Sequence, residues 1–126
     1  MGPGAVIPQD GTYRSITVEM MGDVALVRFQ SSKLIEDVCI QEAGLDLFSL
    51  VRVQGCKKVV VSCAGVDYIA STMMGKFITL DKMVKAAGGQ LRFADVRPEI
   101  YEVFAITKLN RLFDIRDSEE EALASF

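Results

Sequence analysis

Apolar positions in the first third of the chain predict a strand hairpin followed by a helix. Residues 15–20 (SITVEM) and 23–29 (DVALVRF) are rich in strand-forming side chains, and Gly22-Asp23 is typical of a short turn, so they predict an antiparallel hairpin. Between residues 36 and 53, apolar side chains recur at spacings of three and four, which predicts an amphipathic helix. Its apolar stripe consists of Ile40, Ala43, Leu47, Leu50 and Val51.

The rest of the chain predicts strands and helices in alternation. A short continuous apolar run at residues 58–63 is typical of a strand covered on both faces. The predicted strands are residues 58–63, 91–96 and 112–115. The predicted helices open at Ser71, at Pro98 and at a capping box of Ser118 and Glu121, and the second helix of the chain ends at Gly88-Gly89. This order predicts an α/β fold, a single domain with a mixed β-sheet and helices packed on it.

The length of 126 residues fits one domain, because the commonest domain size is about 100–150 residues. We expect that domain over residues 15–126 and a flexible tail over residues 1–14, which hold two of the three prolines. The N-terminus has no basic stretch typical of a signal peptide, and no apolar run approaches the roughly 20 residues of a membrane span. These features predict a soluble, cytoplasmic protein without a membrane partner.

Composition narrows the function classes. The net charge is −3 and there is no basic run, so we expect no nucleic-acid partner, because neutralising phosphates supplies most of that affinity. The chain has no histidine, which removes histidine-paired nucleophiles and histidine metal ligands, and we expect neither metal nor cofactor. Cys39, Cys56 and Cys63 lack Cys-x-x-Cys spacing and predict reduced thiols rather than a disulfide or a zinc site.

Residues 59–72 run from an apolar strand through a loop into a helix, a position where α/β folds place ligand sites. Enzyme motifs fail there. Ser71 lacks the flanking glycines of a nucleophile elbow, and Gly75-Lys76 lacks the Ser or Thr that follows in a Walker A loop. Cys63 lacks the arginine of a Cys-x5-Arg phosphatase loop, and we interpret it as a buried small hydrophobic residue. An enzyme that uses Cys63 or Ser71 is therefore disfavoured, and we predict that the protein is not an enzyme.

The hydroxyl pair Ser71-Thr72 has two interpretations. A serine at a helix start is usually a cap, which stabilises the helix by about 1 kcal/mol. The alternative is a modification site, because a phosphate there would add about −1.5 to −2 charges beside the exposed N–H groups of the helix start. The helix tolerates that charge, whereas a partner lying over it would not. The acidic run over residues 114–121 is interpreted as a solvated helix start.

Residues 59–80 (VVVSCAGVDYIASTMMGKFITL) and 85–92 (KAAGGQLR) resemble the central segment of STAS domains, especially those of anti-sigma factor antagonists. That family has an apolar strand, a Gly-Val-x-Phe/Tyr-Ile motif and an Asp-Ser-Ser/Thr-Gly-x-Gly motif that opens a helix ending at Ala-Gly-Gly. The similarity continues through residues 96–115 and covers about residues 15–123. The resemblance implies a STAS-like fold for nearly the whole domain.

The resemblance also implies a non-catalytic switch. In the family, the unphosphorylated form binds an anti-sigma factor that is also a serine kinase of the histidine-kinase-like ATPase type, and this frees the sigma factor. Phosphorylation of the serine at the helix start breaks the complex, and a PP2C-type phosphatase restores it. The matching phosphoacceptor is Ser71, with Thr72 as the second candidate hydroxyl.

At two positions the chain departs from the family pattern. Ala70 stands where the family has the aspartate before the acceptor, and Met73 stands where it has a glycine.

The expected partner-binding face is the turn and helix start over residues 67–76, with the loop over residues 31–37 alongside. Its members are Asp67, Tyr68, Ala70, Ser71, Thr72, Met73, Met74, Lys76, Ser32 and Lys33. The alternative function is a STAS scaffold subunit of a multi-protein assembly that is never phosphorylated.

Overall fold

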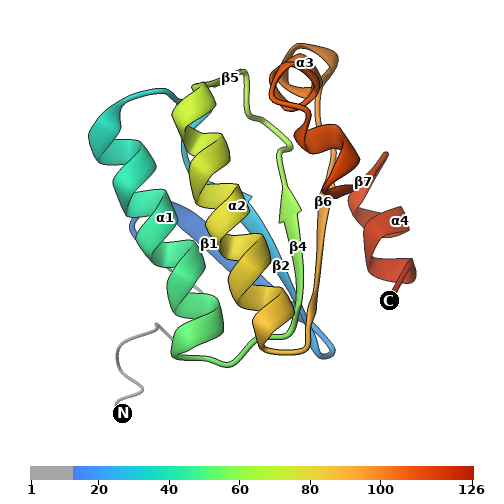
Figure 1. Ribbon diagram of the computed structural model, residues 1–126. Coiled ribbons are helices and arrows are strands. Elements are labelled where there is room, and N and C mark those ends of the chain that lie inside the picture. The colour runs from blue at the N-terminus through green and yellow to red at the C-terminus, as the bar shows by residue number, and fades with distance from the viewer. Residues whose placement is uncertain (1–12) are drawn as a thin grey trace.

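A five-stranded mixed sheet runs through the middle of the molecule in the computed structural model, which describes residues 13–126 (Figure 1). The strands lie in the order β1-β2-β4-β6-β7, where β1 and β2 form the predicted antiparallel hairpin and the later pairs are parallel. The strands are β1 (Ile16–Met21), β2 (Val24–Phe29), β4 (Lys58–Ser62), β6 (Gln90–Ala94) and β7 (Asp114–Arg116). The predicted α/β fold with a mixed sheet is thus confirmed.

Helices cover both faces of this sheet. Helices α1 (Asp37–Arg52) and α2 (Ser71–Ala86) lie side by side on one face, with α3 (Pro98–Ile106) at the end where α2 begins (Figure 1). The short α4 (Glu119–Ala124) covers the other face. Strand β4 contributes buried side chains to both faces of the sheet. Val59 and Val61 belong to the main core under α1 and α2, and Val60 belongs to the smaller cluster under α4. The prediction of a strand covered on both faces is confirmed.

Three fully buried phenylalanines form the centre of the main core. The ring centroids of Phe77 and Phe93 are 4.9 Å apart, and those of Phe93 and Phe104 are 5.5 Å apart. These distances are typical of edge-to-face aromatic pairs. The pairs join α2, β6 and α3, so they fix the end of the molecule at which α2 and α3 begin.

The end of α2 is a Schellman motif, as the glycine pair in the sequence predicts. The N–H of Gly89 donates to the carbonyl of Val84 at 2.8 Å, and the N–H of Gly88 donates to the carbonyl of Lys85 at 3.0 Å. Gly88 has a φ of +79°, which a residue with a side chain rarely adopts. A Cβ atom on Gly89 would overlap the carbonyl oxygen of Lys57, so Gly88 is needed for the turn and Gly89 for the close approach of the chain to Lys57.

Short elements that the sequence did not predict complete the fold. The two-residue strands β3 (Lys33–Leu34) and β5 (Tyr68–Ile69) pair in parallel to form a second small sheet. A 3-10 helix over Leu109–Arg111 turns the chain before β7, so the last strand starts at residue 114 rather than 112. Two residues are too few to show an apolar period, and this is why these strands were missed.

The predicted flexible tail lies mostly outside the described residues, which begin at Tyr13. Tyr13 itself packs against the main core, and its carbonyl oxygen accepts a hydrogen bond from the Gln30 side chain at 2.9 Å. Arg14 pairs with Glu42 at 3.8 Å. These contacts correct the expected boundary, because Tyr13 and Arg14 belong to the folded domain. Within the described residues, no helix is long and apolar enough to cross a membrane.

Helix α4 is fixed to the sheet through its first residue. The Glu119 carboxylate accepts from Arg28 Nε at 2.9 Å, from Arg28 Nη2 at 2.6 Å and from Ser62 Oγ at 2.5 Å. The Arg28 hydrogen bond, more than any other contact, lowers the pKa of Glu119. Ser118 caps the helix by accepting from the N–H of Glu121 at 3.1 Å, as predicted. The interpretation of the whole acidic run as solvated is wrong for Glu119, which anchors α4.

The three cysteines are free thiols in the structure. Cys63 follows β4 and is fully buried, which confirms its interpretation as a core residue. Burial, more than the nearby Asp95 carboxylate, raises the pKa of the Cys63 thiol to about 12. Cys39 and Cys56 are half-buried.

Candidate functional site

The small β3–β5 sheet holds the segment that leads into α2. The N–H of Asp67 donates to the carbonyl of Ser32 at 2.8 Å, and the N–H of Ala70 donates to the carbonyl of Leu34 at 2.9 Å. The Lys33 ammonium lies 5.8 Å from the centre of the Tyr68 ring. The two segments that the sequence assigned to one face therefore lie side by side, at the end of the molecule where α1, α2 and α3 all begin (Figure 1).

Ser71 and Thr72 are the first two residues of α2, and both side chains are exposed. The N-cap is Ala70, with φ −84° and ψ 148°, and it has no side-chain acceptor for the free N–H groups. The first turn of α2 contains no acidic residue. The expectation that Ser71 caps the helix is therefore wrong, because Ser71 already has helical geometry and stands one position too late. The positive end of α2 has no compensating side chain next to the two hydroxyls.

Met73 and Met74 do not belong to the exposed face. Their side chains are 0% and 2% exposed and belong to the main core, together with Phe77 one turn further along. Their assignment to the partner-binding face is wrong, because the helix turns these positions toward the sheet. Met73 fills core space at the position where the family has a glycine.

Lys76 is half-buried and lies across α1. Its Nζ donates to the Gln41 side chain at 3.0 Å. A Cβ atom placed on Gly44 would come within 2.8 Å of the Lys76 side chain, so the lysine stem lies directly over that glycine. The exposed members of the predicted face that remain are Asp67, Tyr68, Ser71, Thr72, Ser32 and Lys33.

Arg97 is a site residue that the sequence reasoning missed. It lies just before α3, and its guanidinium forms ion pairs with Asp67 and, at 3.8 Å, with Glu99. An open groove of about 470 Å³ separates β5 from α3, with Ile100 and Val103 among the residues that line it. Arg97 follows strand β6, and Asp67 follows strand β4. Because the carboxyl ends of parallel strands meet at one sheet edge, these two positions in the sequence could have indicated that the side chains lie close together.

The site offers exposed hydroxyls at a helix start rather than a set of metal ligands. Among residues 13–126, no group of three or more His, Cys, Asp or Glu side chains could hold a metal ion. What the arrangement provides chemically is a hydroxyl beside free backbone N–H groups, where added negative charge is stabilised by the helix.

Comparisons with known proteins give a family. The family model described as the STAS domain matches residues 17–122. BtrV of Bordetella bronchiseptica, a candidate anti-sigma factor antagonist, is 29% identical over 73 residues, which are 58% of this chain. The aligned part spans 63% of the BtrV chain, which is less than two thirds of its length.

Solved structures share the fold at low identity. The anti-sigma-factor antagonist (STAS) domain protein of Planctomyces limnophilus superposes with a TM-score of 0.79 at 18% identity, covering 90% of this chain and 98% of that one. A candidate anti-sigma factor antagonist from Thermotoga maritima superposes with a TM-score of 0.75 at 20% sequence identity, covering 86% of this chain and 92% of that one. The Bacillus cell fate determinant SpoIIAA in its phosphorylated form gives 0.66 at 16% identity, with coverages of 87% and 97%. With the family model matching most of its length, the chain belongs to the STAS domain family.

Proposed function

We propose that this protein is an anti-sigma factor antagonist, a non-enzymatic switch that sequesters an anti-sigma factor and is released from it by phosphorylation of Ser71. The observation that carries the proposal is the exposed Ser71 hydroxyl at the positive end of α2, whose first turn contains neither a capping side chain nor an acidic residue. The names of BtrV and of the similar solved structures, which include SpoIIAA in phosphorylated and unphosphorylated forms, support it.

The physical basis of the switch is the difference between the free and the covered helix start. A phosphate brings about −1.5 to −2 charges, which free N–H groups and the helix dipole stabilise while water surrounds them. A partner that covers the same hydroxyl must bury this charge, and an unpaired buried charge costs several kcal/mol of binding. One modification thus leaves the fold intact and removes the complex.

The partner that we propose is an anti-sigma factor with serine kinase activity of the histidine-kinase-like ATPase type, with a PP2C-type phosphatase as the enzyme that resets the switch. Its contact face would consist of the exposed residues around the helix start, with Ser71 as acceptor and Thr72 as the second candidate. The switch acts in the cytoplasm, without nucleic acid, membrane or cofactor.

A second candidate function is a scaffold subunit that is never phosphorylated. Ala70 favours it, because the acidic side chain that precedes the acceptor in the family pattern is absent from the N-cap of α2. The scaffold would use the same face for a permanent contact.

Incubation with the candidate kinase and ATP, followed by intact mass and phosphopeptide mapping, separates these functions. The switch predicts a single added phosphate on Ser71 and none in the Ser71→Ala variant. Because Ser71 does not cap α2, Ser71→Ala keeps its fold and serves as a clean control. An unmodified wild-type chain after prolonged incubation with an active kinase would favour the scaffold.

A further inference from the structure

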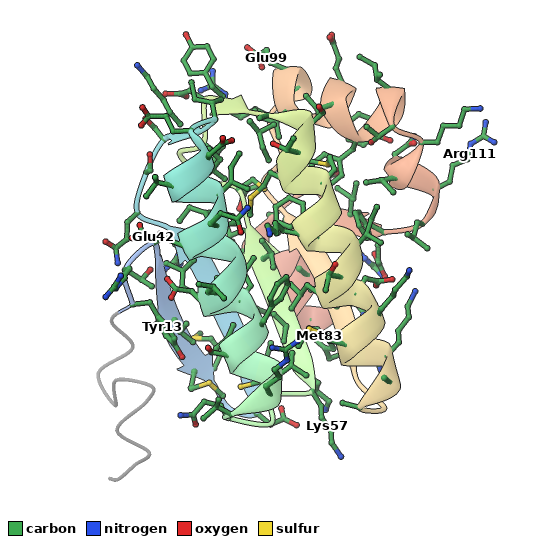
Figure 2. All side chains as sticks on the ribbon, turned by 60° about the vertical axis from the view of Figure 1, so that its left-hand side comes forward. Tyr13, Glu42, Lys57, Met83, Glu99 and Arg111 are labelled. Atoms are coloured by element: carbon green, nitrogen blue, oxygen red, sulfur yellow. The ribbon has the colours of Figure 1, made fainter. Side chains whose placement is uncertain are left out.

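A groove between α1 and α2 starts beside the proposed acceptor. It has a volume of about 410 Å³, and Thr72 is one of the residues that line it, while Ser71 is the residue before. Both helices begin at the same end of the molecule (Figure 1), and the lining residues run from this end along α1 and α2. In Figure 2, the label Glu99 lies at the end of the molecule where α1 and α2 begin, and the label Lys57 lies at the opposite end. The groove is lined by Asp37, Ile40, Gln41, Phe48, Thr72, Gly75, Lys76 and Thr79.

The α1 wall of the groove carries apolar side chains that the fold leaves unused. Gln41 and Phe48 line the groove. Leu45 lies between them on the neighbouring strip of the helix, and Val38 lies two turns before Leu45. Val38 is 71% exposed and Leu45 is 64% exposed, although both are large apolar residues. Neighbouring exposed apolar side chains beside a groove are typical of a protein-docking surface.

The floor of the groove offers little charge. The Lys76 ammonium is held by the Gln41 side chain at 3.0 Å, and its stem lies over Gly44. The α2 wall presents Gly75, with no atom near its missing Cβ, and the hydroxyl side chains Thr72 and Thr79. An apolar side chain can therefore enter along the α1 wall, provided that the Lys76 ammonium keeps its contact with the Gln41 side chain.

Charge is concentrated at the mouth of the groove near the acceptor. Glu36 and Asp37 are both exposed where α1 begins, and Asp37 lines the groove. These two carboxylates would meet a basic side chain of an occupant, while Leu45 and Phe48 would meet its apolar stripe. The lining residues of α1 extend from Asp37 to Phe48, which is a length of about 17 Å, or three turns of a helix.

We propose that this groove binds an amphipathic helix of the anti-sigma factor, with an apolar stripe along α1 and a basic residue at the Glu36–Asp37 end. This inference rests on the proposed function and names the contact that places the partner over Ser71. The groove also gives the Ser71 and Thr72 hydroxyls different positions relative to the partner. A phosphate on Thr72 would enter the groove itself, and one on Ser71 would lie at its mouth, where the Glu36 and Asp37 carboxylates already pair with the basic residue of the occupant and leave the phosphate without a cation.

Calorimetric titration with the purified candidate anti-sigma factor tests the proposal. Thr79→Glu places a charge in the groove and Leu45→Glu places one beside it, each at an exposed position, so the fold is retained. Ile106→Glu is the matched control, because Ile106 is 79% exposed on α3 and away from the groove. We expect the two groove variants to bind at least about tenfold more weakly and Ile106→Glu to bind within about twofold of wild type. Circular dichroism and urea unfolding confirm that all three variants are folded.

The outcomes distinguish the groove from the switch. Ser71→Asp, whose carboxylate stands in for the phosphate, is titrated in the same way. If Leu45→Glu and Thr79→Glu bind like wild type while Ser71→Asp does not bind, the groove proposal is overturned and the proposed function stands. If the groove variants lose binding and Ser71→Asp retains it, the groove is the docking site and the phosphorylation switch is refuted. If the wild-type chain does not bind the anti-sigma factor, both proposals fail.

Discussion

Replacing Ala70 by aspartate should stabilise the protein through a helix cap that the wild-type chain lacks. Ala70 is the N-cap of α2, its φ of −84° and ψ of 148° are those of a capping residue, and no side chain accepts from the first turn. A carboxylate there can accept from a free N–H of the first turn and faces the positive helix end. Exchanging alanine for aspartate at an N-cap is worth about 1 kcal/mol, which is about 4 °C in Tm for a domain of this size.

Urea unfolding at pH 7 measures this gain, with Ala70→Val and Ala70→Asn as matched variants. The valine side chain cannot cap, so it should show no gain, and the asparagine should cap without a charge. The capping carboxylate has a lowered pKa in the folded state, so the aspartate gain should be present near neutral pH and disappear as the pH falls below about 4. The asparagine gain should persist at that pH. The reasoning is refuted if Ala70→Asp is no more stable at pH 7 than Ala70→Val.

Three further predictions concern the fold away from the site. Gly89→Ala should lower the free energy of unfolding by about 3 kcal/mol, because its Cβ would overlap a backbone carbonyl. In the same urea assay, Gly75→Ala should raise the free energy of unfolding by up to about 1 kcal/mol, because Gly75 lies within α2 with open space at its Cβ position. Glu119→Gln should cost about 1 kcal/mol at pH 7 by weakening the contact with Arg28. Because the folded pKa of Glu119 is lowered, that difference should shrink as the pH falls through this pKa, and a constant difference would contradict it. The buried Cys63 should react with a thiol reagent only on unfolding, more slowly than the two half-buried thiols, as timed by absorbance.

Longer elements could be predicted because their apolar side chains repeat over several turns or a full strand. The helix predicted over residues 36–53 is α1 over Asp37–Arg52, and the predicted glycine stop of α2 is the Schellman motif at Gly88. The hairpin could be predicted equally well, because each of its two strands is six residues long. In each case the local pattern and the tertiary packing favour the same structure.

The site was predicted less completely, because its details depend on one-residue shifts and on long-range contacts. The sequence allows Ser71 to be a helix cap or a modification site, but Ser71 is the first helical residue, and this shift of one position removes the capping role. Met73 was placed on the surface next to the hydroxyls, but the helix turns it into the core. The ion pair of Arg97 with Asp67 joins residues 30 positions apart, so no local pattern indicates it, and only the position of both residues after parallel strands could have done so.

The affinity of the anti-sigma factor for the protein phosphorylated on Ser71, compared with the unmodified protein, tests the central claim most directly. Titration calorimetry on the two forms, with Ser71→Ala as the control that cannot be modified, gives the ratio of Kd values. The switch predicts at least about a hundredfold weaker binding by the phosphorylated form, because burying the unpaired charge costs several kcal/mol. It also predicts that Ser71→Ala unfolds and binds like wild type. Equal affinity of the phosphorylated and unmodified forms would contradict the switch and leave a constitutive binding function.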